Sequence, residues 1–272
     1  MRLVKSLLER CFDLITLLSE HAGGMPLGEI SRRLDLPKSA AHRLLTSLIS
    51  LGWAEQESET GFYRLSLRLA VVGQRLLVGT GIPDICQPIL DRLAAATEGL
   101  GRIAIVDHEG LTWIAQSQGA RTGLIYQPDH IARVPLHITA NGKAWLATLD
   151  RNTALALAVA SGLGRSEIGG PRVITTKETF SAALDETQER GWAVAFEDAE
   201  PGVAAVAATV RVGQSVVGTV SVAGPIYRFS QLVIPQLAEQ VCAAADELGT
   251  LWPYRVAGPV ATERSAQATL QT

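Results

Sequence analysis

Apolar side chains recur at helical spacing from the start of the chain. Residues 6–20 carry a broad apolar face, and glycines at positions 23 and 24 end the predicted helix. That face is wider than the core of one small domain needs, so we expect part of it to pack against a second subunit.

Two shorter amphipathic helices are predicted between Pro26 and Leu51, separated by the break Asp35-Leu36-Pro37. Their apolar positions are Leu27, Ile30 and Leu34 in the first helix and Ala41, Leu44, Leu45 and Leu48 in the second. A hairpin pattern follows Gly52, with Gly61 at its tip. Helices and a hairpin in this order predict a winged helix-turn-helix.

The polar face of the second of these helices is rich in hydrogen-bond donors and poor in acids. Such a face suits the major groove of DNA, where cations meet phosphates and polar side chains reach base edges. The residues expected to contact DNA are Lys38, Ser39, His42, Arg43 and Thr46, with Arg64 from the returning strand of the hairpin placed to meet backbone phosphate. Two alternatives stay open: the helix is a solvated helix of an all-α domain, or Arg43 pairs with an acid inside its own domain.

The rest of the chain alternates strand and helix patterns. A mostly apolar helix over residues 67–79 is long enough to join two domains, and the break at residues 80–83 marks the boundary. Strands are predicted at 102–106, 111–116, 192–196, 203–210 and 216–222, and helices at 84–97, 139–149, 153–161, 177–190 and 230–251, with Pro88 interrupting or delaying the first of these helices. Hairpin-linked strands with helices between them predict an α+β fold on an antiparallel sheet.

Length and composition fit this organisation. The 272 residues predict about two domains, and 47% apolar residues are ample for two cores. The net charge of −3 argues against a nucleic-acid-binding protein, but residues 1–80 hold ten Lys or Arg against eight Asp or Glu. A local basic face is enough for a DNA-binding module.

Several classes of protein are not expected. No run of about 18 uncharged apolar residues and no signal-peptide pattern occurs, so we expect a cytoplasmic protein without a membrane span. Cys11, Cys86 and Cys242 are far apart and odd in number, so they predict neither a zinc site nor a disulfide framework. We expect no metal and no cofactor.

One segment, residues 134–144, suggests a ligand site. Thr139 is a good N-cap, which leaves the N–H groups of Ala140, Asn141 and Gly142 free at the positive end of the following helix. Small residues there let a carboxylate approach the backbone. The alternative is a well-capped helix that binds nothing.

An enzymatic interpretation has less support. His137, Lys143, Glu197 and Asp198 could supply a general base. No nucleophile, metal-ligand pair or phosphate-binding loop accompanies them, so we do not expect an enzyme.

Taken in order and spacing, these features make the chain resemble the IclR family of bacterial transcriptional regulators over residues 5–250. The matching positions in the first domain are Ser6, Arg10, Leu27-Gly28-Glu29-Ile30, Arg43-Leu44-Leu45, Leu48, Gly52 and Tyr63-Arg64-Leu65. In the second domain they are Pro135-Leu136-His137, Thr139-Ala140, Gly142-Lys143-Ala144, Leu146-Ala147, Gly191, Glu197-Asp198, Gly202-Val203, Ala207-Ala208, Ser221-Val222-Ala223-Gly224-Pro225 and Arg228.

The resemblance implies a winged helix-turn-helix domain at residues 1–66, a linker helix at 67–82, and a GAF/profilin-like effector-binding domain at 83–251. We expect the polar residues 252–272 to form a mobile tail. The resemblance also implies homodimers whose DNA-binding domains pair, and which often associate into homotetramers. The resemblance implies that such proteins repress or activate nearby catabolic operons in response to a small organic acid or aromatic metabolite.

The resemblance further implies that the carboxylate of the effector meets the N–H groups at the start of the helix at Ala140-Asn141. The expected effector-binding positions are Leu136, Thr139, Ala140, Asn141, Ala195, Ala205, Ser221 and Ala223. Members that bind small oxo-acids place an Asp, a Cys and two Ser where this chain has Ala195, Ala205, Ser221 and Ala223. We therefore expect a wider, more apolar pocket, for an aromatic or medium-chain acid larger than pyruvate or glyoxylate.

The leading hypothesis is thus a sequence-specific, ligand-responsive regulator that binds double-stranded operator DNA. The alternative is a winged-helix protein-interaction module with a small-molecule-sensing domain and no operator of its own. A third hypothesis, an enzyme fused to a DNA-binding module, requires turnover of the ligand.

Overall fold

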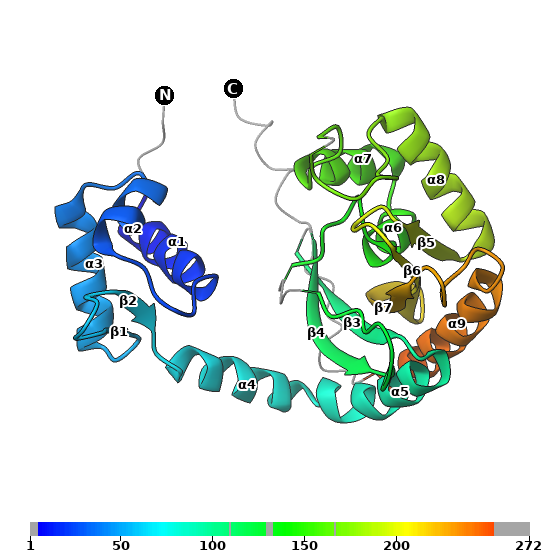
Figure 1. Cartoon of the computed structure of the whole chain (residues 1–272), viewed down its shortest axis with the longest axis horizontal. Coiled ribbons are helices and arrows are strands. Elements are labelled where there is room, and N and C mark those ends of the chain that lie inside the picture. Colours follow the sequence, from blue (N-terminus) through cyan, green and yellow to red (C-terminus); the bar gives the residue numbers. More distant parts are fainter. Residues whose placement is uncertain (1–4, 109, 129–132, 166, 253–272) are drawn as a thin grey trace, which may run out of the picture. The chain divides into compact units, whose positions relative to one another are not determined.

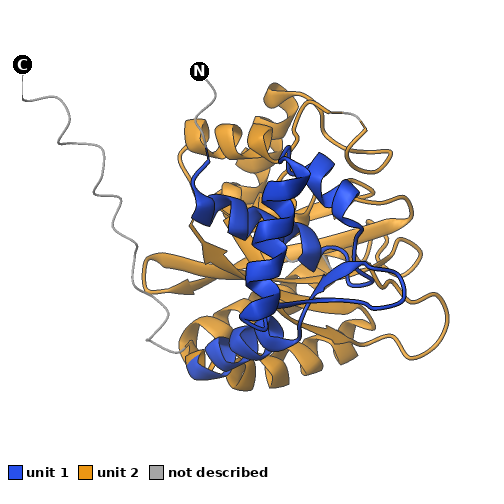
Figure 2. Ribbon diagram, turned by 90° about the vertical axis from the view of Figure 1, so that its left-hand side faces the viewer, with its two compact units in different colours: residues 1–79 blue, residues 80–272 orange. Residues whose placement is uncertain are grey.

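The computed structural model of the protein describes residues 5–108, 110–128, 133–165 and 167–252. The chain divides into two compact units, residues 1–79 and 80–272 (Figure 2). Of the tail expected to be mobile, only Trp252 falls among the described residues, and its side chain is buried.

The first unit is a winged helix-turn-helix followed by a long helix (Figure 1). Its elements are α1 (Leu7–Ser19), α2 (Leu27–Arg33), α3 (Lys38–Ser50), β1 (Ala54–Gln56), β2 (Tyr63–Leu65) and α4 (Arg68–Thr80). The apolar positions that predicted α2 and α3 do form the core, because Ile30, Ala41 and Leu45 are fully buried. β1 and β2 pair antiparallel, with Glu55 opposite Arg64.

A capping box fixes the start of α1. The Ser6 hydroxyl accepts a hydrogen bond from the Glu9 N–H at 3.2 Å, and the Glu9 carboxylate accepts one from the Ser6 N–H at 2.6 Å. The core of the unit uses only one side of this helix, since Leu7, Leu8 and Phe12 are more than half exposed. The apolar side chains that the core of this unit does not need are therefore exposed on its surface.

The helix α4 is apolar but buries no side chain within its unit. Leu76 and Val78 are exposed by 70% and 60%. No single helix in the described ranges has the length and hydropathy needed to cross a membrane; only the broken pair of α4 and the following helix α5 (Ile82–Thr97), counted together, reaches them.

The second unit is built on a five-stranded antiparallel sheet in the order β4-β3-β7-β6-β5. Its elements are α5 (Ile82–Thr97), β3 (Leu100–Asp107), β4 (Gly110–Gln118), α6 (Ala140–Leu146), α7 (Arg151–Ala160), α8 (Lys177–Arg190), β5 (Trp192–Phe196), β6 (Val203–Val212), β7 (Ser215–Pro225) and α9 (Ile234–Leu251). Helices α5 and α9 cover one face of the sheet, and α6 lies on the other, with α7 and α8 beyond it (Figure 1).

The two faces of this sheet carry side chains of different size, because alternate residues of a strand point to opposite sides. Toward α5 and α9 the strands present large groups such as Ile103, Val206 and Val222. Toward α6 they present small ones such as Ala193 and Ala207. The small residues let α6 lie close to the strands.

Some helix limits differ from those predicted. Helix α5 starts at Ile82 and continues through Pro88, because buried residues on both sides of the proline pack against the sheet. Helix α6 ends at Leu146 rather than at residue 149, and α9 starts at Ile234 rather than at 230. Residues 230–233 form a turn that delivers Pro235 to the first turn of α9, where a missing N–H costs nothing.

The backbone of Leu136, in the segment before α6, leaves no room for a side chain at Gly142. A Cβ at this position would collide with the backbone of Leu136, so Gly142→Ala should lower the free energy of unfolding by about 1–3 kcal/mol despite the better helix propensity of alanine. Gly73→Ala is the matched control, since Gly73 lies in α4 with open space around it and the change should raise stability by up to about 1 kcal/mol. Urea unfolding of the two variants checks this, and similar effects of both would contradict it.

Candidate functional site

The five polar residues of α3 expected to contact DNA are all exposed. The first turn of α3 holds no acidic residue, and Pro37, its N-cap, supplies no capping side chain. Within the described part of the chain, the N–H groups of Lys38 and Ser39 have no hydrogen-bond partner. The positive end of the helix is therefore open toward solvent, as a phosphate contact requires.

The two arginines of the expected DNA surface differ in their surroundings. Arg43 forms no ion pair with any described residue, so the alternative that it pairs with an acid of its own domain gains no support. Arg64 is engaged: its Nε donates to Glu55 at 2.9 Å, and its Nη1 lies 3.8 Å from Glu57 (side-chain exposure 42%). A phosphate would have to compete with these two carboxylates for Arg64.

A small cavity of about 50 Å³ lies in the second unit, bordered by the start of α6 and the small-residue face of the sheet. Most of its lining is apolar. The lining residues are Arg102, Trp113, Tyr126, Ile138, Thr139, Ala140, Asn141, Ala195, Ala199, Val203, Ala205, Ser221 and Ala223.

Seven of the eight residues expected to bind an effector line this cavity. Leu136 does not; it is buried in a separate cluster with Ala104 and Leu146. The cavity is not roomy, since about 50 Å³ holds one or two water molecules and ligand pockets usually measure about 300–1,000 Å³. The methyl groups at Ala195 and Ala205 thus do not by themselves make the wide pocket that we expected.

The helix terminus at the cavity is only partly free. The Thr139 hydroxyl accepts a hydrogen bond from the Gly142 N–H at 3.1 Å and donates to the Pro135 carbonyl at 2.7 Å. The expectation that the Gly142 N–H is available was therefore wrong, because the cap uses it. The N–H groups of Ala140 and Asn141 have no partner among the described residues.

Three larger residues of the lining were not anticipated: Arg102, Trp113 and Tyr126. The Arg102 guanidinium lies over the Trp113 ring, 4.9 Å from its centroid. The Tyr126 hydroxyl donates to Glu200 at 3.1 Å, and burial followed by the Glu200 charge raises the pKa of Tyr126 above its usual value. The only sequence signal for any of these three residues was the position of Arg102, a charged residue in the middle of an apolar strand.

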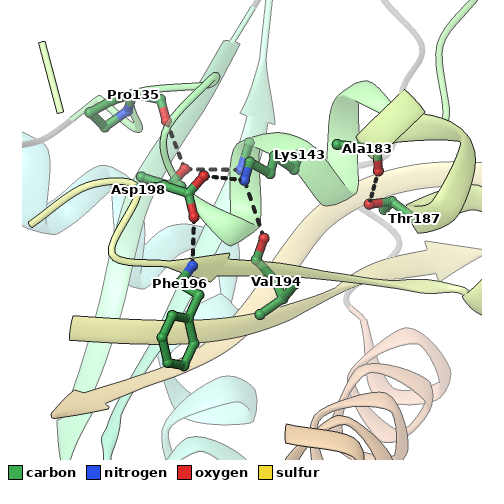
Figure 3. A network of polar contacts seen from close by, with 9 residues as sticks. Pro135, Lys143, Ala183, Thr187, Val194, Phe196 and Asp198 are labelled. Atoms are coloured by element: carbon green, nitrogen blue, oxygen red, sulfur yellow. Dashed lines mark hydrogen bonds and ion pairs between the residues drawn. The ribbon is translucent and has the colours of Figure 1, made fainter. Parts of the chain in front are cut away.

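A buried ion pair holds α6 to the sheet (Figure 3). Lys143 Nζ of α6 lies 2.7 Å from Asp198 Oδ1 and 3.3 Å from the Val194 carbonyl oxygen of β5. The other oxygen of Asp198 accepts from the Phe196 N–H at 2.5 Å, so the carboxylate also fixes the chain just after β5. Both charges are paired and hydrogen-bonded, as buried charges must be.

Three of the four residues that could have supplied a general base are used structurally. Lys143 and Asp198 bind each other, and Glu197 accepts a hydrogen bond from the Gly202 N–H at 2.9 Å. His137 is 1% exposed and lies outside the cavity lining; burial, and then the charge of Lys143, lowers its pKa. Among the described residues there is no group of three or more His, Cys, Asp or Glu that could hold a metal ion.

Comparison with known proteins decides the family. Residues 74–250 match the family model described as bacterial transcriptional regulator IclR C-terminal, and residues 7–58 match the IclR helix-turn-helix domain. The chain belongs to the IclR family. IclR proteins are transcriptional regulators that bind DNA and carry a C-terminal effector domain, and the family is not one of enzymes.

Individual IclR relatives agree with this assignment. The chain is 28% identical over 246 residues to the HTH-type transcriptional regulator BhcR of Paracoccus denitrificans, covering 89% of this chain and 85% of that protein. The crystal structure of an IclR regulator from Alicyclobacillus acidocaldarius superimposes with a TM-score of 0.78 at 21% identity, over 91% of this chain and 99% of that one. The crystal structure of an IclR homologue from Microbacterium hydrocarbonoxydans, solved with 4-hydroxybenzoate, superimposes with a TM-score of 0.73 at 22% identity. The match covers 90% of this chain and 98% of that one.

Breaking the buried pair should be costly. Lys143→Met leaves the Asp198 carboxylate buried without its cation, so we expect the free energy of unfolding of the full chain to fall by about 3–5 kcal/mol. Arg92→Met removes the cation of the exposed pair with Glu247 and should cost less than about 1 kcal/mol. Equal losses in urea titrations of these two variants would contradict the structural role given to Lys143.

Proposed function

We propose that this IclR protein is a sequence-specific regulator of a catabolic operon whose binding to operator DNA responds to a small organic acid. The effector is an aromatic or medium-chain monocarboxylic acid. The proposal assigns operator binding to the winged helix-turn-helix at residues 1–66, the linker to residues 67–82 and effector binding to residues 83–251.

The exposed face of α3 supports the DNA contact. Lys38 and Ser39 stand at an uncapped helix start, where backbone N–H groups attract phosphate. His42, Arg43 and Thr46 follow on the same exposed face, from which they can reach base edges in a major groove. In this proposal Arg64 meets a backbone phosphate only by exchanging it for Glu55 and Glu57.

The observation that carries the effector assignment is the set of unused donors around an otherwise apolar cavity. The N–H groups of Ala140 and Asn141 have no partner in the described chain, and Ser221 adds a hydroxyl to the lining, whereas the Thr139 hydroxyl is already used by the helix cap. A carboxylate with an apolar body matches both properties. The 4-hydroxybenzoate bound by the Microbacterium hydrocarbonoxydans homologue is an acid of this kind.

An aromatic acid does not fit into about 50 Å³, so binding must open the cavity. The segment 119–128 contributes Tyr126 to the lining, and side-chain hydrogen bonds from Gln118 and Arg228 hold its backbone. The domain would then have a closed state, with this segment in place, and an open state, with it displaced. The ligand would bind the open state more tightly than the closed one. Such a difference is what a population shift in DNA binding needs.

Exposed apolar side chains support a homodimer, which can associate further into a homotetramer. Leu7, Leu8 and Phe12 on α1 and Leu76 on α4 stand out of the first unit without a partner in its core. A two-fold contact through these helices would bury them and bring two copies of α3 to two operator half-sites.

The first experiment is an anisotropy titration of the protein with its own upstream intergenic DNA, with and without aliphatic and aromatic acids. We expect saturable binding that one class of acid alters, and that weakens about 10³-fold or more between 50 and 200 mM salt if six or more phosphates are contacted. Failure to bind any promoter DNA at any salt concentration would favour the protein-interaction module without an operator.

A single substitution tests the role of α3. Arg43→Ala should weaken operator binding by about 1–3 kcal/mol if its guanidinium contacts a base, and it should relax specificity at one position. Arg211→Ala, the same change at an exposed residue of β6 in the second unit, is the control and should leave the affinity unchanged. An unchanged operator affinity of folded Arg43→Ala would remove Arg43 from the interface.

A further inference from the structure

Arg102 occupies an unusual place for a charged residue. It lies in the interior of β3 between apolar neighbours and lines the cavity on the same side of the sheet as the alanines. The strand pairing sets it directly opposite Ser221 of β7. Its guanidinium is held over the Trp113 ring, which restricts its orientation.

No described residue forms an ion pair with this guanidinium, although the Glu200 charge acts on it from beyond ion-pair distance. In the described ranges of the chain, no carboxylate lies within 4.0 Å of Arg102, and its side chain makes no hydrogen bond. Burial lowers the pKa of Arg102, while the Tyr126 and Glu200 groups act in the opposite direction. Arginine stays protonated under these conditions, so a permanent positive charge with five N–H donors faces an apolar cavity.

The other unused donors lie close to Arg102. The Asn141 side chain donates to the Thr219 hydroxyl at 3.0 Å, which sets the first turn of α6 over β7. Thr219 and Ser221 are two residues apart on that strand and therefore point to the same face. The start of α6 and Arg102 thus flank the same part of β7, with the Ser221 hydroxyl between them.

We propose that Arg102 binds the carboxylate of the effector, together with the Ser221 hydroxyl opposite it on β7. This inference rests on the proposed function and narrows it, because a guanidinium without an ion-pair partner among the described residues selects the ionised acid and rejects its neutral analogues. The ligand class is a monocarboxylate whose apolar body lies against the alanines of the sheet.

The test compares acids with their amides. Binding of benzoate, 4-hydroxybenzoate and hexanoate is measured by calorimetry, beside benzamide, 4-hydroxybenzamide and hexanamide, on the full-length protein. We expect at least one acid to bind the natural protein and its amide to bind at least about 30-fold more weakly, because the amide leaves the partly buried guanidinium without an ion-pair partner.

Variants at Arg102 locate the effect. Arg102→Gln should weaken binding of the acid about 30-fold or more and abolish the preference for the acid over the amide. Arg102→Lys keeps the charge but not the planar guanidinium, so its affinity for the acid should lie between those of the natural protein and Arg102→Gln. Arg211→Gln is the matched control and should bind like the natural protein; thermal unfolding verifies that each variant is folded.

The outcomes separate the two proposals. Equal acid affinity in the natural protein and in folded Arg102→Gln would overturn the role of Arg102 and leave the acid effector standing. If Arg102→Gln does not fold, the natural protein decides, since amides that bind as tightly as acids overturn the role. No binding by any acid of the panel would overturn the acid effector proposed above, and the role of Arg102 with it.

Discussion

The second unit depends on how closely α6 approaches the sheet. Alanines at 193, 195, 205 and 207 face the helix, and Gly142 lets the helix touch the backbone of the preceding segment. The buried ion pair between Lys143 and Asp198 then holds α6 in place against the sheet. Because of this contact, the helix start, Ser221 and Arg102 border a single small cavity instead of three separate surfaces.

The two faces of the sheet differ in the size of their side chains and therefore in their roles. On the side of α5 and α9, fully buried side chains such as Val206, Val220 and Leu248 form an extended apolar cluster. On the side of α6, small side chains leave room at one point, where polar groups gather. We expect changes on the first face to alter the free energy of unfolding, and changes on the second face to alter ligand binding as well.

Much of this could be predicted from local signals. Helical periodicity and the Gly61 turn predicted the first unit, and α8 and β5 were predicted to the residue, with Gly191 as the break between them. The capping box at Ser6 was not predicted. The limits of α6 and α9 and the passage of α5 through Pro88 could not be predicted, because tertiary packing decides them. Arg102 was missed for a related reason: its importance comes from the strand pairing with β7 and from the position of Tyr126, neither of which leaves a mark in local sequence.

The narrow cavity also has a kinetic consequence. If an aromatic acid is the effector, as proposed above, we expect the segment that carries Tyr126 to move before the acid binds, so that the opening of the domain limits the rate of association. Acids of very different affinity would then associate at nearly the same slow rate and differ in how long they stay. The response of the promoter would then depend more on how long the effector stays bound than on how fast it associates.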